Sequence, residues 1–468
     1  MRRWGERLMA GGGGQLGRFA LSEDSRWPIW FCAALWVGLW FSINTGPWRL
    51  EEMPVTAMEW AHYLRTLFPA IPLLFFGVVR WRTRARWPMP RTLWWWSWYG
   101  VVGVLSSAVS ERPPHALYWA LLYLSVLGAA WAFMQGPNPL TRAKWFNVLS
   151  WLTTAGFLGA MLFLAREALF GSEGDLYGAY GLQSEVAGMP MSRSSGLARF
   201  ATVPGLVSLV MLFYGPLWSR LVFGVVGIAS AVFIYQLQSR GAIFGLAVTL
   251  VFLLFAVAGR ARSLVLMGLV LAVFAVVTDV VPQRVQEQVV EHLSRGQSRE
   301  EFASMTGRTR AWELALHVVW QSPLFGHGPQ ADRFLTREHV HNTYLYALLQ
   351  GGFVGLGLFL VGFAVMWWWI LRVLYTPWAG RVEGYAVWLM CASILTFFTV
   401  RSVTEVCGPL FAVDLMVMVP AIAYVEAFGQ KVSLLRAAAR QQRSVRTASA
   451  MRGSRIGEQL IPVSRFST

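Results

Sequence analysis

His341 stands where a polar stretch of the sequence meets a long apolar one. From Tyr346 to Leu371 the chain carries no charged residue, which is typical of a membrane-spanning helix, so the imidazole is expected where that helix meets water. An imidazole with an ordinary pKa of about 6.5 can take a proton from a hydroxyl group at neutral pH. The residue types therefore predict a general base at the membrane surface, although a structural histidine at this level would give the same pattern.

Arginines recur at the ends of other apolar stretches, and arginine is well suited to bind phosphate. Its planar guanidinium group donates paired hydrogen bonds and stays charged at any working pH. The candidates are Arg193, Arg199, Arg240 and Arg308. Charged groups near a bilayer are costly and mark functional sites by default, although a lone arginine can also extend to lipid headgroups. The pattern favours a site in which arginines hold a diphosphate while His341 activates an alcohol.

Other chemistries have weaker support in the sequence. His339 and His341 are two residues apart, but no further ligand at recognisable spacing accompanies them, so no metal or cofactor is predicted. The chain has no phosphate-binding Walker loop, no dinucleotide fingerprint and no Asp-x-Asp pair, which argues against a soluble nucleotide donor. Arg401 and Glu405 are interpreted as a structural ion pair and are left out of the predicted site.

The composition is that of an integral membrane protein. Of the 468 residues, 56% are hydrophobic and only 14% are charged, well below the roughly 25% of soluble domains. The formal net charge of +16 does not indicate nucleic-acid binding, because the basic residues lie between apolar runs and form no continuous patch.

The apolar runs predict an all-α membrane protein of about twelve spans. These are 28–44, 63–79, 92–109, 115–134, 145–165, 201–214, 221–236, 242–258, 264–281, 343–371, 384–400 and 409–427. The sixth is short, and an earlier start near Gly196 is also compatible with the sequence. Most Lys and Arg residues fall on the side of the N-terminus if the spans alternate, so both termini are predicted to be cytoplasmic. His341 and the candidate arginines then share the opposite face.

The predicted organisation has two long loops on that opposite face. The segments are a tail (1–27), nine spans (28–281) with a first long loop (166–200), a second long loop (282–342), three spans (343–427) and a basic tail (428–468). The second loop is expected to form a helical cap. Within it, Arg308 to Gln321 has helical periodicity with Trp312, Leu316, Val319 and Trp320 on one face, Pro323 ends the helix, and Gly326 to Pro329 is expected to be a tight turn.

These motifs, in this order, resemble the O-antigen ligase and polymerase superfamily of bacterial envelope enzymes. The resemblance covers nearly the whole chain outside the tails. The matching motifs are Arg193-Ser194-Ser195-Gly196, Ser239-Arg240-Gly241, Gly307-Arg308 with Trp312, Pro323-Leu324-Phe325-Gly326-His327-Gly328 and His341-Asn342-Thr343-Tyr344-Leu345. The Arg193 segment departs from the family pattern, because Val203-Pro204-Gly205 stands where a Pro-Asn pair usually follows the glycine.

The resemblance implies an enzyme of the bacterial inner membrane with a periplasmic site. Such an enzyme transfers a glycan, without a metal, from undecaprenyl diphosphate to an acceptor hydroxyl; for the ligases that acceptor is a sugar of lipid A–core, and lipopolysaccharide is completed. His341 is then the general base, Arg240 and Arg308 bind the diphosphate, and Arg193 is a third ligand. Arg199 matches no motif and is a candidate by position alone. The implied partners are the lipid-linked glycan, lipid A–core and membrane lipids.

Two alternatives remain open at this point. Within the superfamily, a polymerase of repeat units or a ligase that glycosylates protein has similar motifs. In another class, a transporter or lipid flippase also has about twelve spans. Carriers, however, usually place ionisable groups near the bilayer midplane, whereas the conspicuous charges here lie at one face.

Overall fold

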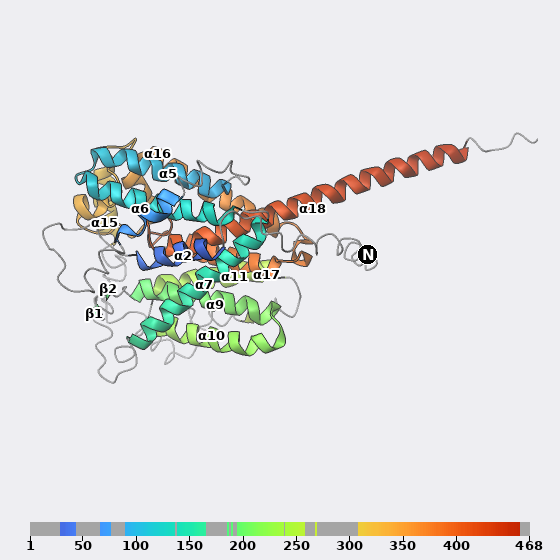
Figure 1. The fold of residues 1–468 in the computed structure, drawn as a ribbon, viewed down its shortest axis with the longest axis horizontal. Helices are drawn as coiled ribbons and strands as arrows, with labels where there is room; N and C mark the ends of the chain where they lie inside the picture. Colours follow the sequence, from blue (N-terminus) through green and yellow to red (C-terminus); the bar gives the residue numbers. More distant parts are fainter. Residues whose placement is uncertain are drawn as a thin grey trace, which may run out of the picture.

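The protein is a bundle of long apolar helices, seen in a computed structural model (Figure 1). The structure describes residues 29–43, 66–75, 89–135, 138–164, 185–186, 189–190, 194–237, 239–257, 267–268 and 308–458. Its elements are α2 (Ile29–Phe41), α5 (Arg91–Ser106), η2 (Ser107–Val109), α6 (Pro113–Met134), α7 (Pro139–Leu164), β1 (Glu185–Val186), β2 (Met189–Pro190), α9 (Ser194–Tyr214), α10 (Leu217–Gln236), α11 (Arg240–Ala256), α15 (Arg308–Val319), η4 (Asp332–Thr336), α16 (Thr343–Leu374), η5 (Ala379–Arg381), α17 (Tyr385–Arg401) and α18 (Val413–Glu458). In the described part, the only strands are β1 and β2, a short antiparallel hairpin.

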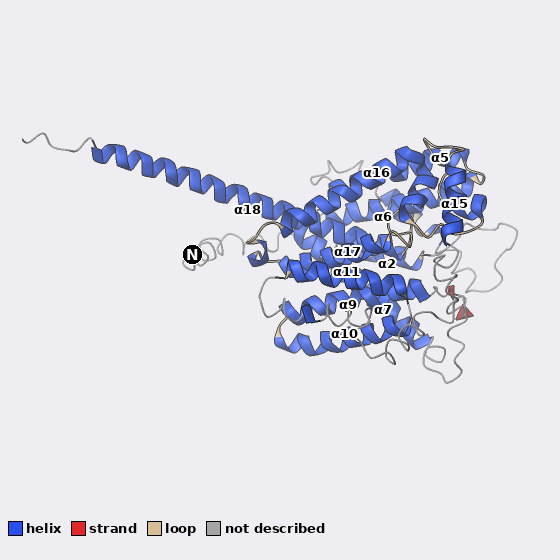
Figure 2. Cartoon of the chain, turned by 180° about the vertical axis from the view of Figure 1, so that it is seen from behind, coloured by secondary structure: helices blue, strands red, loops and turns tan. Residues whose placement is uncertain are grey.

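The core forms around α17 and the first half of α18, whose side chains are almost all buried. Helix α17 packs against α11 and α18, α18 packs against α7, and α16 packs against α5 (Figure 2). Helix α10 lies at the edge of the bundle against α9 and exposes apolar side chains such as Leu221 and Val225. An exposed apolar face of this extent is expected where a helix contacts lipid.

The all-helical membrane architecture predicted from the sequence is confirmed in outline. Four helices of the described part are long and apolar enough to cross a membrane, namely Pro113–Met134, Leu217–Tyr235, Thr343–Leu374 and Val413–Gln442. Shorter apolar helices are Trp30–Phe41, Ala198–Tyr214, Arg240–Ala256 and Tyr385–Arg401. Helices coincide with predicted spans one, three to eight and ten to twelve. Span two is described over residues 66–75, which are helical from 70 to 75, and most of span nine lies outside the described residues. The total of twelve spans, the side of the termini and the cap stay predictions.

Helix boundaries differ from the predicted spans in two places. Helix α9 begins at Ser194, so the sixth span does start before residue 201, close to the suggested Gly196. Helix α18 does not end near residue 427 but continues to Glu458 and projects beyond the other helices (Figure 1). The basic segment that follows the last span is therefore helical over most of its length.

The helix predicted after Arg308 is present as α15, and its buried face agrees with the predicted one at Trp312 and Val319 but not at Leu316 and Trp320. Leu316 and Trp320 are exposed, at 45% and 67%, whereas Ala311, Ala315 and Val319 are buried. These three residues are four apart and form one stripe on the helix. The small alanine side chains let α15 approach the bundle closely, which explains why the larger apolar residues beside them face outward.

The turn predicted at Gly326 to Pro329 is confirmed, and it fills a break in α16. Gly352 has φ +61° inside α16, so the helical hydrogen bonding is interrupted there. The backbone N–H groups of His327 and Gly328 donate to the carbonyls of Leu349 and Gln350, both at 2.9 Å. A broken helix in a membrane protein is tolerated where other protein groups complete its hydrogen bonds. The turn thereby fastens the segment that follows α15 to α16.

We expect Gly352→Ala to destabilise the protein by about 2 kcal/mol or more. A β-carbon at this position would lie 2.3 Å from the backbone of Leu324, and φ is in the left-handed region. Gly357→Ala is the matched control, because a β-carbon there meets nothing within 4 Å on the same helix. The measurement is thermal unfolding of both variants in detergent. Equal unfolding midpoints would contradict the proposed close contact.

Candidate active site

The segment His341-Asn342-Thr343 begins α16 and is fastened to the loop that follows α17. Asn342 is the N-cap: its Oδ1 accepts the N–H groups of Tyr344 and Leu345 at 2.9 and 3.0 Å. The Thr343 hydroxyl donates to the carbonyl of Glu405 at 2.8 Å and accepts the N–H of Cys407 at 2.8 Å. These contacts explain why the polar residues follow His341 directly, since they fix its backbone against the 402–407 loop.

One carboxylate, that of Glu405, joins the predicted base to a predicted phosphate ligand. His341 Nδ1 lies 3.0 Å from Glu405 Oε2, and Arg308 Nη2 donates to Glu405 Oε1 at 3.0 Å. The three side chains are largely buried, with exposures of 19%, 13% and 25% for His341, Glu405 and Arg308. Glu405 is left out of the site predicted from the sequence because it is interpreted there as the structural partner of Arg401. Its contacts with His341 and Arg308 are remote in the chain, so no local pattern pointed to them.

Glu405 is ionised in this setting. Burial opposes its charge, but the hydrogen bond from His341 and the positive charges of Arg401 and Arg308 outweigh that effect and lower the pKa of Glu405 well below its usual range. An ionised carboxylate can only accept hydrogen bonds, so His341 Nδ1 carries the proton of this contact. Its other nitrogen, Nε2, is then the atom that can accept a proton from a substrate.

His341 is held closer to its neutral form than an ordinary histidine. Burial is the main cause of its lowered pKa, and the positive charges of His339 and Arg308 act in the same direction, while Glu405 opposes them. The residue has φ +46°, a left-handed backbone conformation that is uncommon outside glycine. Such a conformation is kept only where surrounding contacts impose it, and here Asn342 and Thr343 supply those contacts.

Arg240 approaches the same group of residues from another helix. It is the first residue of α11, and its charge and that of Arg308 repel each other at this range. A β-carbon on the neighbouring Gly241 would lie 3.3 Å from the Thr404 hydroxyl, next to Glu405. The structure therefore brings Arg240, Arg308 and His341 to one end of the bundle. Arg193 lies outside the described residues.

Arg199 is placed one step away from this cluster. Its Nη1 donates to Asp414 Oδ1 at 2.9 Å, and Asp414 is 1% exposed at the start of α18. Asp414 and Glu405 both act electrostatically on the buried Arg401. Charges thus alternate from Arg199 through Asp414 and Arg401 to Glu405. The prediction that Arg199 binds substrate stays a prediction, and its ion pair gives it a second role in supporting the site.

A second histidine–carboxylate pair adjoins the first. His339 Nδ1 lies 2.6 Å from Asp332 Oδ2, and the His339 and His341 rings meet edge to face with centroids 4.5 Å apart. Within the described residues, no group of three or more His, Cys, Asp and Glu side chains is arranged to hold a metal ion.

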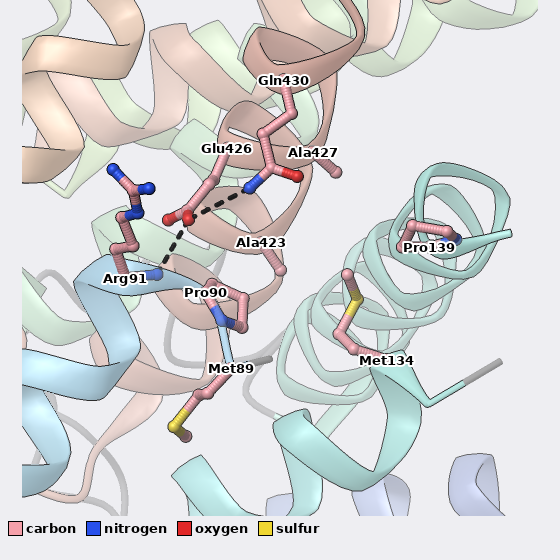
Figure 3. Close-up of a pocket in the computed structure, with 9 residues that line it drawn as sticks. All are labelled: Met89, Pro90, Arg91, Met134, Pro139, Ala423, Glu426, Ala427 and Gln430. Carbon is pink, nitrogen blue, oxygen red and sulfur yellow. Dashed lines mark hydrogen bonds between the residues drawn. The ribbon is translucent and has the colours of Figure 1, made fainter. Parts of the chain in front are cut away.

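A cavity of about 290 Å³ lies at the other end of the bundle and has a different character. Its acidic residue, Glu426, accepts the backbone N–H of Arg91 at 2.8 Å at the start of α5 (Figure 3). This contact caps a helix N-terminus, which is a structural use of a carboxylate. Apart from Glu426, no residue that lines the cavity has a side chain that could act as a general base. The cavity therefore lacks the combination of a base and clustered arginines that is found around His341.

The comparisons with known proteins agree with the motifs. Residues 225–360 match a family model described as O-Antigen ligase. Over this segment the chain is similar to O-antigen ligases, which supports the resemblance that its motifs indicate. The matched segment contains Arg240, Arg308 and His341, whereas Arg199 and Glu405 lie outside it. A search of curated proteins found no match. The family and the apolar helices indicate a membrane-bound glycosyltransferase that acts on lipid-linked glycan and lipid acceptor substrates.

We expect Glu405→Gln to shift the titration of His341 to lower pH. The substitution removes the negative charge that stabilises the imidazolium form, so the pKa of His341 falls further. The readout is modification of His341 by diethyl pyrocarbonate, which needs the neutral imidazole, followed by mass spectrometry across a pH series. Glu338→Gln is the control because Glu338 is exposed in the same region. An unchanged midpoint in Glu405→Gln would show that the contact has no electrostatic effect.

Proposed function

We propose that this protein is the O-antigen ligase that transfers glycan from undecaprenyl diphosphate to a hydroxyl group of lipid A–core. The observation that carries the proposal is the Glu405 carboxylate, which contacts both His341 and Arg308 at 3.0 Å. A candidate base and a candidate phosphate-binding cation are thereby held within reach of one substrate. That pairing is what a transfer with a diphosphate leaving group requires.

In the proposed reaction, His341 Nε2 takes the proton of the acceptor hydroxyl as its oxygen attacks the anomeric carbon. The bond between that carbon and the diphosphate oxygen breaks, and its electron pair leaves with the diphosphate. Arg308 and Arg240 offset the charge that develops on the leaving group. The displacement is single, so the configuration at the anomeric carbon inverts. Arg193, by its resemblance to the family motif, is a third diphosphate ligand.

Glu405 is proposed to orient this chemistry without touching substrate. By accepting the Nδ1 proton, it fixes the tautomer that leaves Nε2 available, a role that carboxylates commonly play toward a catalytic histidine. It also holds the Arg308 guanidinium group through one nitrogen. The other donors of that group remain available for phosphate oxygens.

The proposed location is the bacterial inner membrane with the site facing the periplasm. The support is twofold: the bias of Lys and Arg in the sequence toward the N-terminal side, and the position of His341 at the opposite end of α16 from Arg372. Two lipid substrates would enter laterally between helices, and the second long loop, whose last part includes α15, would cover the acceptor.

We expect His341→Ala to abolish glycan transfer while the protein is still made. The measurement is the lipopolysaccharide ladder of a deletion strain carrying the variant, together with transfer by purified protein in detergent. His317→Ala, which alters an exposed histidine on α15, is expected to restore the ladder fully. A near-normal ladder with His341→Ala would reject the assignment.

The same strain separates the alternatives. Loss of ligated O-antigen with accumulation of lipid-linked polymer identifies a ligase, whereas single repeat units on lipid A–core identify a polymerase. Glycan transfer by the purified protein in detergent identifies an enzyme, because a detergent solution has no two compartments between which a transporter could act.

We expect Arg308→Lys to lower kcat/KM about a hundredfold. Lysine keeps the charge but cannot donate a planar pair of hydrogen bonds to a phosphate group. Arg310→Lys is the matched control, because Arg310 is exposed two residues further along α15. The assay is transfer from a lipid-diphosphate donor by purified protein. Equal losses in both variants would mean that the effect is general to α15.

A further inference from the structure

The peptide unit that precedes His341 is held by a side chain of α15. Trp312 Nε1 donates to the carbonyl oxygen of Val340 at 2.7 Å. Val340 is fully buried, so an unsatisfied carbonyl here would be costly, and the indole N–H removes that cost. On its other side, the N–H of Val340 donates to Asp332 Oδ2 at 3.4 Å. Both backbone groups of Val340 are thereby bound by side chains, directly before the predicted base.

This peptide unit sets the direction of the His341 side chain. The dihedral angle φ of His341 describes rotation between the plane of the Val340–His341 peptide bond and the rest of His341, and its value is +46°. A residue other than glycine relaxes from such a left-handed conformation unless contacts on both sides oppose the rotation. On the following side, the Thr343 N–H donates to the Ser402 carbonyl at 3.0 Å. The hydrogen bond from Trp312 opposes the rotation on the preceding side.

Trp312 also shares a helix face with a predicted diphosphate ligand. It lies four residues after Arg308 on α15, a spacing that places both side chains on one side of the helix. From this side, Arg308 donates to Glu405 at 3.0 Å and Trp312 donates to Val340 at 2.7 Å. Helix α15 therefore contacts the His341 segment twice, once through the carboxylate that orients the imidazole and once through the backbone that carries it.

We propose that Trp312 is a positioning residue that fixes the backbone of His341 and thereby aims its Nε2 at the acceptor hydroxyl. This inference rests on the proposed function, since it takes His341 as the base and Arg308 as a ligand of the donor. Helix α15 then sets two positions at once, that of the bound diphosphate and that of the base. Holding both on one helix reduces the rearrangement that transfer requires.

The first test is the steady-state kinetics of Trp312→Phe, which keeps an aromatic ring but removes the N–H donor. We expect kcat to fall about tenfold or more, because a poorly aimed base loses most of its effect, while KM for the lipid-diphosphate donor changes little. Replacement of Trp312 by 3-benzothienylalanine, which keeps the shape of the indole and lacks its N–H, is expected to give the same loss. Trp320→Phe is the control, because Trp320 is 67% exposed beside the same helix. An unchanged kcat in both Trp312 variants overturns the inference.

A double-mutant cycle separates positioning of the base from a general loss of packing. Glu405 also orients His341, so Trp312→Phe and Glu405→Gln are expected to act on the same group. The double variant should then lose about as much in kcat as the more damaged single variant. Losses that multiply would show that Trp312 acts by a route other than the orientation of His341, which contradicts the proposal.

The third test needs no catalysis. Hydrogen–deuterium exchange of the full-length protein in detergent is followed by mass spectrometry over residues 338–345. We expect faster exchange in this segment with Trp312→Phe, no change there with Trp320→Phe, and unchanged exchange in α10 at the edge of the bundle. Unchanged exchange over 338–345 overturns this inference even where His341→Ala is inactive. Faster exchange together with normal transfer by His341→Ala overturns the proposed function instead.

Discussion

The structure around the site depends on the buried, ionised carboxylate of Glu405. It lies between cationic or donor groups from three places, namely Arg308 at the start of α15, His341 before α16 and Arg401 at the end of α17. Removing a carboxylate from water is unfavourable unless such partners surround it, so the helices must meet at this point for Glu405 to stay charged. The contact with His341 that helps to stabilise the Glu405 carboxylate also fixes the position of the His341 imidazole.

The rest of the bundle keeps that meeting point rigid. The break in α16 at Gly352 is completed by the turn at Gly326 to Gly328, which fastens the segment behind α15 to the helix that begins beside His341. Behind Glu405, Asp414 pairs with Arg199 and also places a negative charge near the buried Arg401. A transfer reaction gains from such preorganisation, because groups held at fixed distances need little rearrangement when charge develops.

Much of the fold could be predicted because it follows from local pattern. Apolar runs between basic residues predicted helices where α5, α6, α16 and α17 occur, since a backbone in lipid must satisfy its own hydrogen bonds. The turn after Pro323 was predictable from its glycines. The complete buried face of α15 was not, because periodicity marks large apolar residues, whereas close packing selected the alanines Ala311 and Ala315. Nor was the length of α18, because the helix continues through Gly429, where the sequence offers a stop signal, to Glu458.

By itself, the sequence determined the helical membrane character and the ordered motifs that resemble O-antigen ligases, and it marked His341, Arg240 and Arg308 as candidate site residues. Only the tertiary structure decided their partners. Glu405 lies 64 residues from His341 and 97 from Arg308, and Asp414 lies 215 residues from Arg199. Contacts at such separations depend on which helices pack together and in what register. No local periodicity carries that information, so a buried ion pair between distant helix ends becomes visible only once the helices are assembled.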